Sequence, residues 1–223
     1  MGGPIQAAFY DMDGTIVRTN LVHSYLFMAR NEPSVGRSAL KTATGVAKIP
    51  LFFAVDQVSR FKFNEMLFAG YAGTFRDHCL EYAEEHFEKV LKPNIFPGSK
   101  ELVDRGRQRG LRQVIVSGSL DFMVAPLARY LGIDDLITNR LEFVDGVATG
   151  KLEQPIVVGA NKARIIQEYA QKHDVDLLQS YGFSDSWSDY PMLAVVGRPA
   201  AVNPDRRLRR SAQEHAWPIL DVR

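Results

Sequence analysis

Two aspartates stand one residue apart directly after an apolar run, and this is the stretch of the chain most suited to chemistry. Asp11 and Asp13 follow residues 6–10, and Gly14 and Thr15 come next. The run is typical of a buried strand, and burying a bare charge is costly unless the charge is paired or bound to a metal. The pair therefore marks either a surface turn or two carboxylates held for a reaction.

A second pair of acids follows another apolar run. Asp185 and Asp189 lie four residues apart after residues 177–183, so one helical turn between them would let both face one pocket. Mg²⁺ prefers hard oxygen ligands and keeps part of its shell for water and substrate phosphate. Asp11, the backbone carbonyl of Asp13, and an acid of this second pair could therefore supply the protein ligands of a magnesium site.

Two further positions suit phosphate binding. Ser117 and Gly118 follow the apolar run 111–116, where a hydroxyl and backbone N–H groups can face a phosphate oxygen; a plain helix N-cap is the alternative. Lys162 begins an amphipathic helical pattern. A site that gathers carboxylates and phosphate needs a fixed cation, although a lone lysine at such a position is commonly a solvated surface residue.

The elements that must position these residues predict an α/β fold. Three apolar runs alternate with helical patterns, which favours a Rossmann-like parallel sheet with helices on both faces. Functional groups gather at the carboxyl ends of such strands. Residues 18–95 show helical periodicity without a strand pattern, so we predict a helical cap at 18–95 inserted into a core formed by 1–17 and 96–223. Asp145-Gly146 predicts a hairpin.

These motifs, in this order, resemble those of the haloacid dehalogenase superfamily. The first motif is met by Asp11-Met12-Asp13-Gly14-Thr15, the second by Ser117, the third by Lys162 and the fourth by Asp185 and Asp189. The helical insertion after the first motif is similar to that of the phosphoserine-phosphatase-like branch, subfamily IB.

The resemblance implies a mechanism. Asp11 would attack phosphorus and form an aspartyl-phosphate, and Asp13 would act as general acid and then general base. Ser117 and Lys162 would bind the nonbridging oxygens. Mg²⁺, held by Asp11, the carbonyl of Asp13 and Asp185, with Asp189 in support, would offset the charge between nucleophile and phosphate. We therefore predict a magnesium-dependent phosphatase acting on a small phosphomonoester. A phosphotransferase, or a catalytically inactive binding protein on the same fold, is the alternative.

The leaving group is less clearly indicated. Phosphoserine phosphatases carry a glutamate seven residues after the second aspartate of the first motif, but this chain has Asn20 there. A neutral amide does not supply that charge, which disfavours phosphoserine; histidinol phosphate, lysophospholipid-type phosphates and other small phosphomonoesters stay open. We predict that substrate is bound by residues of the turn, the second motif and the cap: Gly14, Thr15, Gly118, Asn20 and Arg60.

Composition excludes several other classes of protein. The 223 residues carry a formal net charge of +1, which gives no general electrostatic reason to bind nucleic acid. The apolar stretch 45–55 is interrupted by Lys48 and Pro50 and is too short to span a membrane. A single cysteine, Cys79, favours a reducing compartment, so we expect a cytoplasmic enzyme. The sequence leaves the oligomeric state open.

Overall fold

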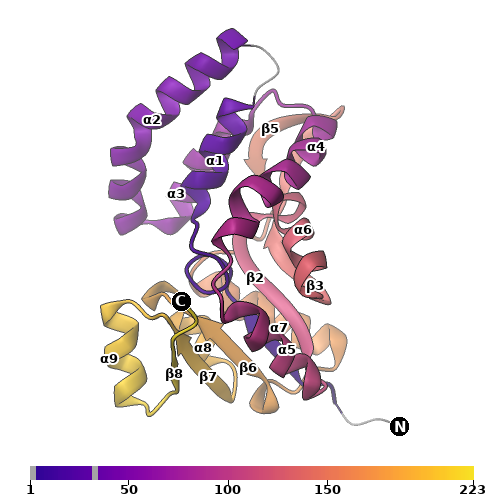
Figure 1. The fold of residues 1–223 in the computed structure, drawn as a ribbon, viewed down its shortest axis with the longest axis vertical. Helices are drawn as coiled ribbons and strands as arrows, with labels where there is room; N and C mark the ends of the chain where they lie inside the picture. The colour runs from indigo at the N-terminus through magenta and orange to yellow at the C-terminus, as the bar shows by residue number, and fades with distance from the viewer. Residues whose placement is uncertain (1–3, 32–34) are drawn as a thin grey trace.

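A parallel sheet forms the centre of the computed structural model, which describes residues 4–31 and 35–223 (Figure 1). Within these residues six strands lie in the order β3-β2-β1-β6-β7-β8, and every neighbouring pair is parallel. The strands span β1 (Ala7–Tyr10), β2 (Arg112–Leu120), β3 (Asp135–Asn139), β6 (Tyr181–Ser184), β7 (Arg198–Val202) and β8 (Ile219–Leu220). The predicted α/β fold is confirmed.

Helices cover both faces of this sheet. β1 is buried along its whole length, with Ala8 and Tyr10 facing one core and Ala7 and Phe9 facing the other. The first core is closed by α5 (Ser99–Gln108) and α6 (Asp121–Leu131), and the second by α7 (Ala160–His173), α8 (Tyr190–Ala194) and α9 (Arg206–Glu214). A strand buried on both faces reads as a continuous apolar run, which is why residues 6–10 lack alternation.

Helices also make up most of the segment between β1 and α5. They are α1 (Leu21–Arg30), α2 (Val35–Val58), α3 (Arg60–Phe68), α4 (Arg76–His86), the 3₁₀ turns η1 (Ala69–Tyr71) and η3 (Lys92–Asn94), and the π-helical turn η2 (Phe87–Leu91). Figure 1 shows α1, α2 and α3 grouped at one end of the molecule, away from β7, β8 and α9. We call α1, α2 and α3 the cap helices.

The two stretches of chain that enter and leave this helical segment lie side by side. The backbone N–H of Arg18 donates to the carbonyl of Asn94, and the N–H of Phe96 donates to the carbonyl of Ile16. These contacts fall at the boundaries predicted for the cap, 17/18 and 95/96. The entry to and the exit from the helical segment are thus held together beside the sheet.

A hairpin packs against the same helices. β4 (Leu141–Val144) and β5 (Val147–Leu152) are antiparallel, and the turn Asp145-Gly146 has positive φ at both residues, as the Asp-Gly signal predicts. Leu141 and Ala148 belong to the apolar cluster that also contains Phe63 and Leu67 of α3. The hairpin, from the second half of the chain, therefore contributes to the apolar core of the helical segment.

Two strand predictions need correction. Residues 177–179 form a 3₁₀ turn, η4 (Leu177–Gln179), instead of the start of a strand, because the Asp176 carboxylate accepts from the N–H groups of Leu178 and Gln179. β2 runs on to Leu120, past the predicted end at 116. In the described part of the chain, no helix has the length and hydrophobicity of a membrane span.

Candidate active site

Asp11 lies at the carboxyl end of the central strand β1. Its backbone N–H donates to the carbonyl of Phe183 at 2.9 Å, which extends the pairing of β1 with β6 by one residue. The side chain is almost fully buried. Because β1 sits between β2 and β6, the residues that follow all three strands meet at this edge, as expected for a parallel sheet.

The turn after Asp11 depends on glycine. Gly14 has φ of +86°, and a Cβ there would lie 2.2 Å from Oδ2 of Asp185. The Thr15 hydroxyl lies 3.3 Å from Oδ2 of Asp11 and 3.4 Å from Oδ1 of Asp185. The turn thus brings two carboxylates to one hydroxyl, and Thr15 itself is buried behind them.

Lys162 stands between two of the predicted acids. Its Nζ donates to Oδ1 of Asp11 at 2.6 Å and to Oδ2 of Asp189 at 2.7 Å, and all three side chains are at most 9% exposed. Burial disfavours the charged ammonium, but the two carboxylates outweigh it and hold the pKa of Lys162 above its ordinary value. Lys162 is therefore a fixed, buried cation and not a solvated surface residue.

Asp189 accepts hydrogen bonds that were not predicted from the sequence. Its Oδ2 accepts from the Ser184 hydroxyl at 2.9 Å as well as from Lys162. Asp185 and Asp189 are joined by a 3₁₀ turn, η5 (Trp187–Asp189). In this arrangement Asp189 orients the lysine, while Asp185 faces Asp11.

Asp13 is placed differently from Asp11. Its carboxylate accepts from the Ser119 hydroxyl at 3.3 Å and from the Thr19 hydroxyl at 3.5 Å. Burial, followed by the charge of Asp11, raises the pKa of Asp13 to about 7. A carboxyl group with such a pKa can both donate and accept a proton near neutral pH.

Of the second motif, the backbone at Gly118 lies at the cavity, while the side chain of Ser117 is buried. Gly118 lines the cavity described below, whereas the Ser117 hydroxyl is buried and accepts from the N–H of Ser119 at 3.0 Å. Behind them Asn139 donates to the carbonyl of Gly118 at 2.7 Å and accepts from the N–H of Val157 at 2.7 Å. Asn139 thus fixes the position of the glycine.

The donor set suits a hard divalent cation. Burial, then the charges of Asp11 and Asp189, raise the pKa of Asp185, and burial also raises the pKa of Asp11 against the opposing charge of Lys162. The negative charge of these neighbouring carboxylates is thus only partly compensated by Lys162. No group of three or more His, Cys, Asp or Glu side chains in the described residues is arranged to hold a metal, so a site here needs a backbone carbonyl or substrate oxygen as well.

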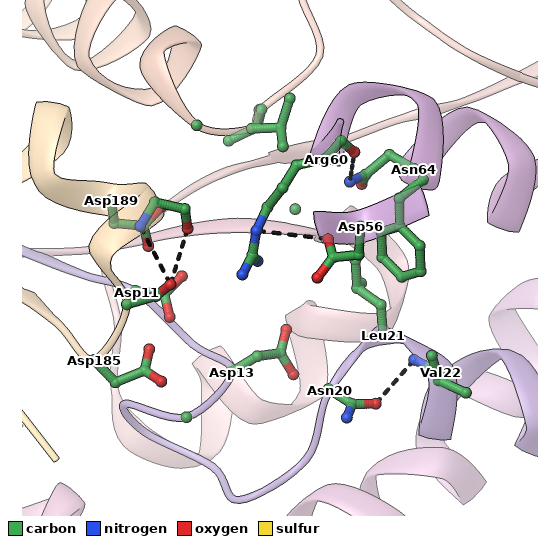
Figure 2. A pocket seen from close by; sticks show the side chains of 18 of the residues that line it. Asp11, Asp13, Asn20, Leu21, Val22, Asp56, Arg60, Asn64, Asp185 and Asp189 are labelled. Atoms are coloured by element: carbon green, nitrogen blue, oxygen red, sulfur yellow. Dashed lines mark hydrogen bonds and ion pairs between the residues drawn. The ribbon is translucent and has the colours of Figure 1, made fainter. Parts of the chain in front are cut away.

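A cavity of about 290 Å³ opens over these groups and reaches the cap helices (Figure 2). Its far wall includes Phe52, Phe53 and Asp56 of α2, and Arg60 at the start of α3. Figure 2 shows Arg60 extending between Asp56 and Asp11. Arg60 Nε lies 3.5 Å from Oδ1 of Asp56.

Asn20 lines the cavity but its side chain serves the fold. Its Oδ1 accepts from the N–H groups of Val22 and His23 at 3.1 and 3.3 Å, and His23 completes a capping box at the start of α1. Its carbonyl oxygen is therefore engaged by the start of α1, and a contact with substrate would have to come from the Nδ2 donors.

The structure also brings in residues that the sequence analysis gave no role. Thr19, Ser119 and Ser184 hold the acids, and Asn64, Asn139 and Asp56 line or support the cavity. Serine, threonine and asparagine at turns are too common to stand out. Asp56 lies inside a helix, where an acid is ordinarily solvent-facing.

Comparison with known proteins identifies the family. The profile of haloacid dehalogenase-like hydrolases matches residues 8–194. The chain belongs to this family. The resemblance inferred from the motifs is thereby confirmed, and the phosphoserine-phosphatase-like branch is the one its relatives support.

Three curated relatives and one solved structure illustrate the likeness. The "inhibition of morphological differentiation protein" of Streptomyces azureus is 32% identical over 98% of this chain and 79% of its own length. Phosphoserine phosphatase SerB1 of Mycobacterium tuberculosis is 29% identical over 97% and 71%. Histidinol-phosphatase of Neisseria meningitidis is 27% identical over 97% and 98%. A Bordetella pertussis protein described as of unknown function has the same fold, with a TM-score of 0.87, 24% identity, and coverage of 99% and 100%.

Proposed function

We propose that this protein is a magnesium-dependent phosphatase that hydrolyses a small phosphomonoester through an aspartyl-phosphate on Asp11. The observation that carries the proposal is the setting of Asp11. One of its oxygens is held by Lys162 at 2.6 Å, and the other lies beside Thr15, which also contacts Asp185. A nucleophilic carboxylate needs this kind of fixed orientation next to a cation if it is to approach an anionic phosphate.

The reaction divides between the two aspartates of the first motif. Asp11 attacks phosphorus, the P–O bond to the alcohol breaks, and Asp13 gives its proton to the departing oxygen. Asp13, now a carboxylate, takes a proton from water as that water attacks the phosphoryl group on Asp11. The bond between phosphorus and the Asp11 oxygen breaks, inorganic phosphate leaves, and Asp11 is again a carboxylate and Asp13 again protonated. A pKa of about 7 fits Asp13 for both steps. Lys162 and Ser117, together with the backbone around Gly118, would bind the nonbridging oxygens.

Asp11, Asp185 and the carbonyl of Asp13 are the groups that would hold Mg²⁺. A buried carboxylate, Asp11, and a half-buried one, Asp185, share one hydroxyl beside a glycine that a Cβ could not replace, and this matches the oxygen chemistry the ion requires. When bound, the ion would reduce the repulsion between the carboxylates and the phosphate.

The names of two relatives reduce the range of alcohols that we consider as the leaving group. One is named for phosphoserine and one for histidinol phosphate, and in both compounds the alcohol carries an amine. We extend this chemistry to the present chain as a proposal: its substrate is the phosphate ester of a small amino alcohol.

The proposal is tested with p-nitrophenyl phosphate. We expect phosphate release that stops with EDTA and returns with excess Mg²⁺, and a loss of at least about 10³-fold in kcat for Asp11→Asn, because an amide is not a nucleophile. Asp174→Asn is the matched control, since Asp174 is exposed in a turn with φ of 53°, which asparagine also adopts. Retained turnover in Asp11→Asn, with a folded protein, would remove Asp11 as the nucleophile.

A further inference from the structure

Among the described residues, the cap side of the cavity carries one acidic side chain, Asp56, and several aromatic ones. Phe52, Phe53 and Phe63 line the same wall, and Phe52 packs edge-on against Phe63 with ring centroids 6.1 Å apart. A carboxylate beside aromatic faces is the usual environment for a bound amine, because the ring faces attract cations as well. The wall is thus chemically suited to a positively charged group.

Asp56 also lacks a hydrogen bond that its burial calls for. Its Oδ1 is buried and receives no hydrogen bond from any described residue. The nearest cation, Arg60 Nε, is 3.5 Å away, which is too long for a good hydrogen bond. A buried acceptor without a donor is costly, so an N–H group from a ligand would satisfy it.

The balance of charge around the cavity favours the same kind of ligand. Among the described residues that line it, the acids are Asp11, Asp13, Asp56, Asp185 and Asp189, and the bases are Arg60 and Lys162. Lys162 is fully engaged by Asp11 and Asp189. On the sheet side the acids are engaged by Lys162 or assigned to the proposed metal and proton transfer, so the cap-side carboxylate, Asp56, is the group that would attract a positively charged leaving group.

We propose that Asp56 is the specificity-determining residue of this site, and that it binds the ammonium group of an amino-alcohol phosphate. This inference rests on the proposed phosphatase function. It gives Asp56 the charge complement that Asn20 cannot supply, since Asn20 is neutral and caps α1.

Arg60 is the group that the ammonium displaces. Its side chain is 48% exposed while that of Asp56 is 20% exposed, and the 3.5 Å contact between them is too long to hold the guanidinium firmly. Exchange of one cation for another on Asp56 is therefore easy. The charge of Arg60 acts on Asp11 across the cavity, so the released guanidinium stays favourably placed above an anionic phosphoryl group.

The test compares two esters of the same size, O-phosphoethanolamine and 2-hydroxyethyl phosphate, which differ in an ammonium against a hydroxyl group. We expect the wild-type kcat/KM to favour the ammonium ester by about 10- to 100-fold, the range for a hydrogen bond to a charged group. Asp56→Asn should bring this ratio close to one, and Asp56→Glu should restore part of it. The matched control is Glu65→Gln, which removes an exposed charge from α3 outside the cavity and should keep the wild-type ratio.

A second variant separates a direct role of Asp56 from one exerted through Arg60. In an Arg60→Met background, Asp56→Asn should still lower the ratio; if it no longer does, Asp56 acts only by holding Arg60 and the inference is wrong. A wild-type ratio near one also overturns it, provided that p-nitrophenyl phosphate is hydrolysed and Asp11→Asn is inactive. If the wild type releases no phosphate from any ester in the presence of Mg²⁺, the phosphatase function itself fails.

Discussion

The two walls of the cavity hold their charges in different ways. On the sheet side, Lys162 lies 2.6 and 2.7 Å from two carboxylates, and none of these side chains is more than 9% exposed. On the cap side, Arg60 and Asp56 approach to 3.5 Å and are 48% and 20% exposed. A tightly paired, buried group is fixed in place, whereas a loosely paired one can exchange partners. The difference suggests that the sheet side performs the reaction and the cap side selects the substrate.

A substitution on the sheet side should also lower the free energy of unfolding more than one on the cap side. Removing one member of a buried ion pair leaves an uncompensated charge and typically costs about 3–5 kcal/mol. The cap pair, by contrast, contributes on the order of 1 kcal/mol or less. Changes on the two sides should therefore differ in kind, with loss of kcat on one and altered KM on the other.

Among variants that keep the nucleophile Asp11, the largest effect is expected for Lys162→Met. This change removes the cation that orients Asp11 and offsets charge on the nonbridging oxygens, so kcat for p-nitrophenyl phosphate should fall by about 10²- to 10³-fold. Lys172→Met, an exposed position on the same helix α7, is the matched control. Circular dichroism should establish that both variants are folded. A loss confined to KM would place Lys162 in ground-state binding and weaken the contrast between the walls.

A smaller effect is expected where the two sides meet. Asn64 of α3 accepts a hydrogen bond from Asn139, the residue that also binds the carbonyl of Gly118. Asn64→Ala removes this link between cap helix and sheet, and KM should rise by about 2- to 10-fold, the range for one hydrogen bond, with a smaller change in kcat.

The control for Asn64→Ala is Asn31→Ala. Both side chains donate to the carbonyl four residues earlier, at 2.8 Å, but Asn31 lies outside the cavity. Steady-state kinetics of the two variants separate the loss of that local bond from the loss of the link to Asn139. A fall in kcat comparable to that of Lys162→Met would show that Asn64 belongs functionally with the sheet side.

The same division explains what the sequence could predict. Asp11 and Asp189 come together because each lies shortly after a strand of one parallel sheet, and such strands end at a common edge. Lys162 instead lies in the first turn of α7, after the separate hairpin β4-β5, so its place in the site was predicted from the resemblance of the motifs. The short strand β3 escaped prediction because Asp135 and Asn139 at its ends are typical of turns.

The cap side could not be predicted in the same way. Helical periodicity identifies α1 to α3, but the rotation of each helix about its axis depends on packing between residues far apart in sequence. Phe52 and Phe53 are neighbours, yet one is fully buried and the other is 54% exposed at the cavity. The importance of Asp56 follows only from its place beside Arg60. The role given to Asn20 from the resemblance likewise needed the capping geometry to be judged.

The smallest effect on turnover is expected for His86, a buried polar residue outside both walls. It ends α4, is fully buried and packs edge-on against Phe27. Neither ring nitrogen has a hydrogen-bond partner within the described chain, in contrast to the fully paired Lys162. Burial lowers the pKa of His86 to about 4 from an ordinary value of 6.5.

This shift makes the stability of the protein depend on pH. Between pH 6.5 and 4 the unfolded chain binds a proton at His86 that the folded chain does not, so the free energy of unfolding falls as the pH is lowered through this window. From pH 7.5 to pH 5 the contribution is about 2 kcal/mol. Urea unfolding of the wild type and of His86→Leu at both pH values isolates it, because all other titrating groups are shared. The wild type should lose about 2 kcal/mol more than the variant, with kcat at pH 7.5 similar in the two. Equal losses would mean that His86 is protonated as easily in the folded protein as in the unfolded chain, and that the contrast with Lys162 is one of geometry alone.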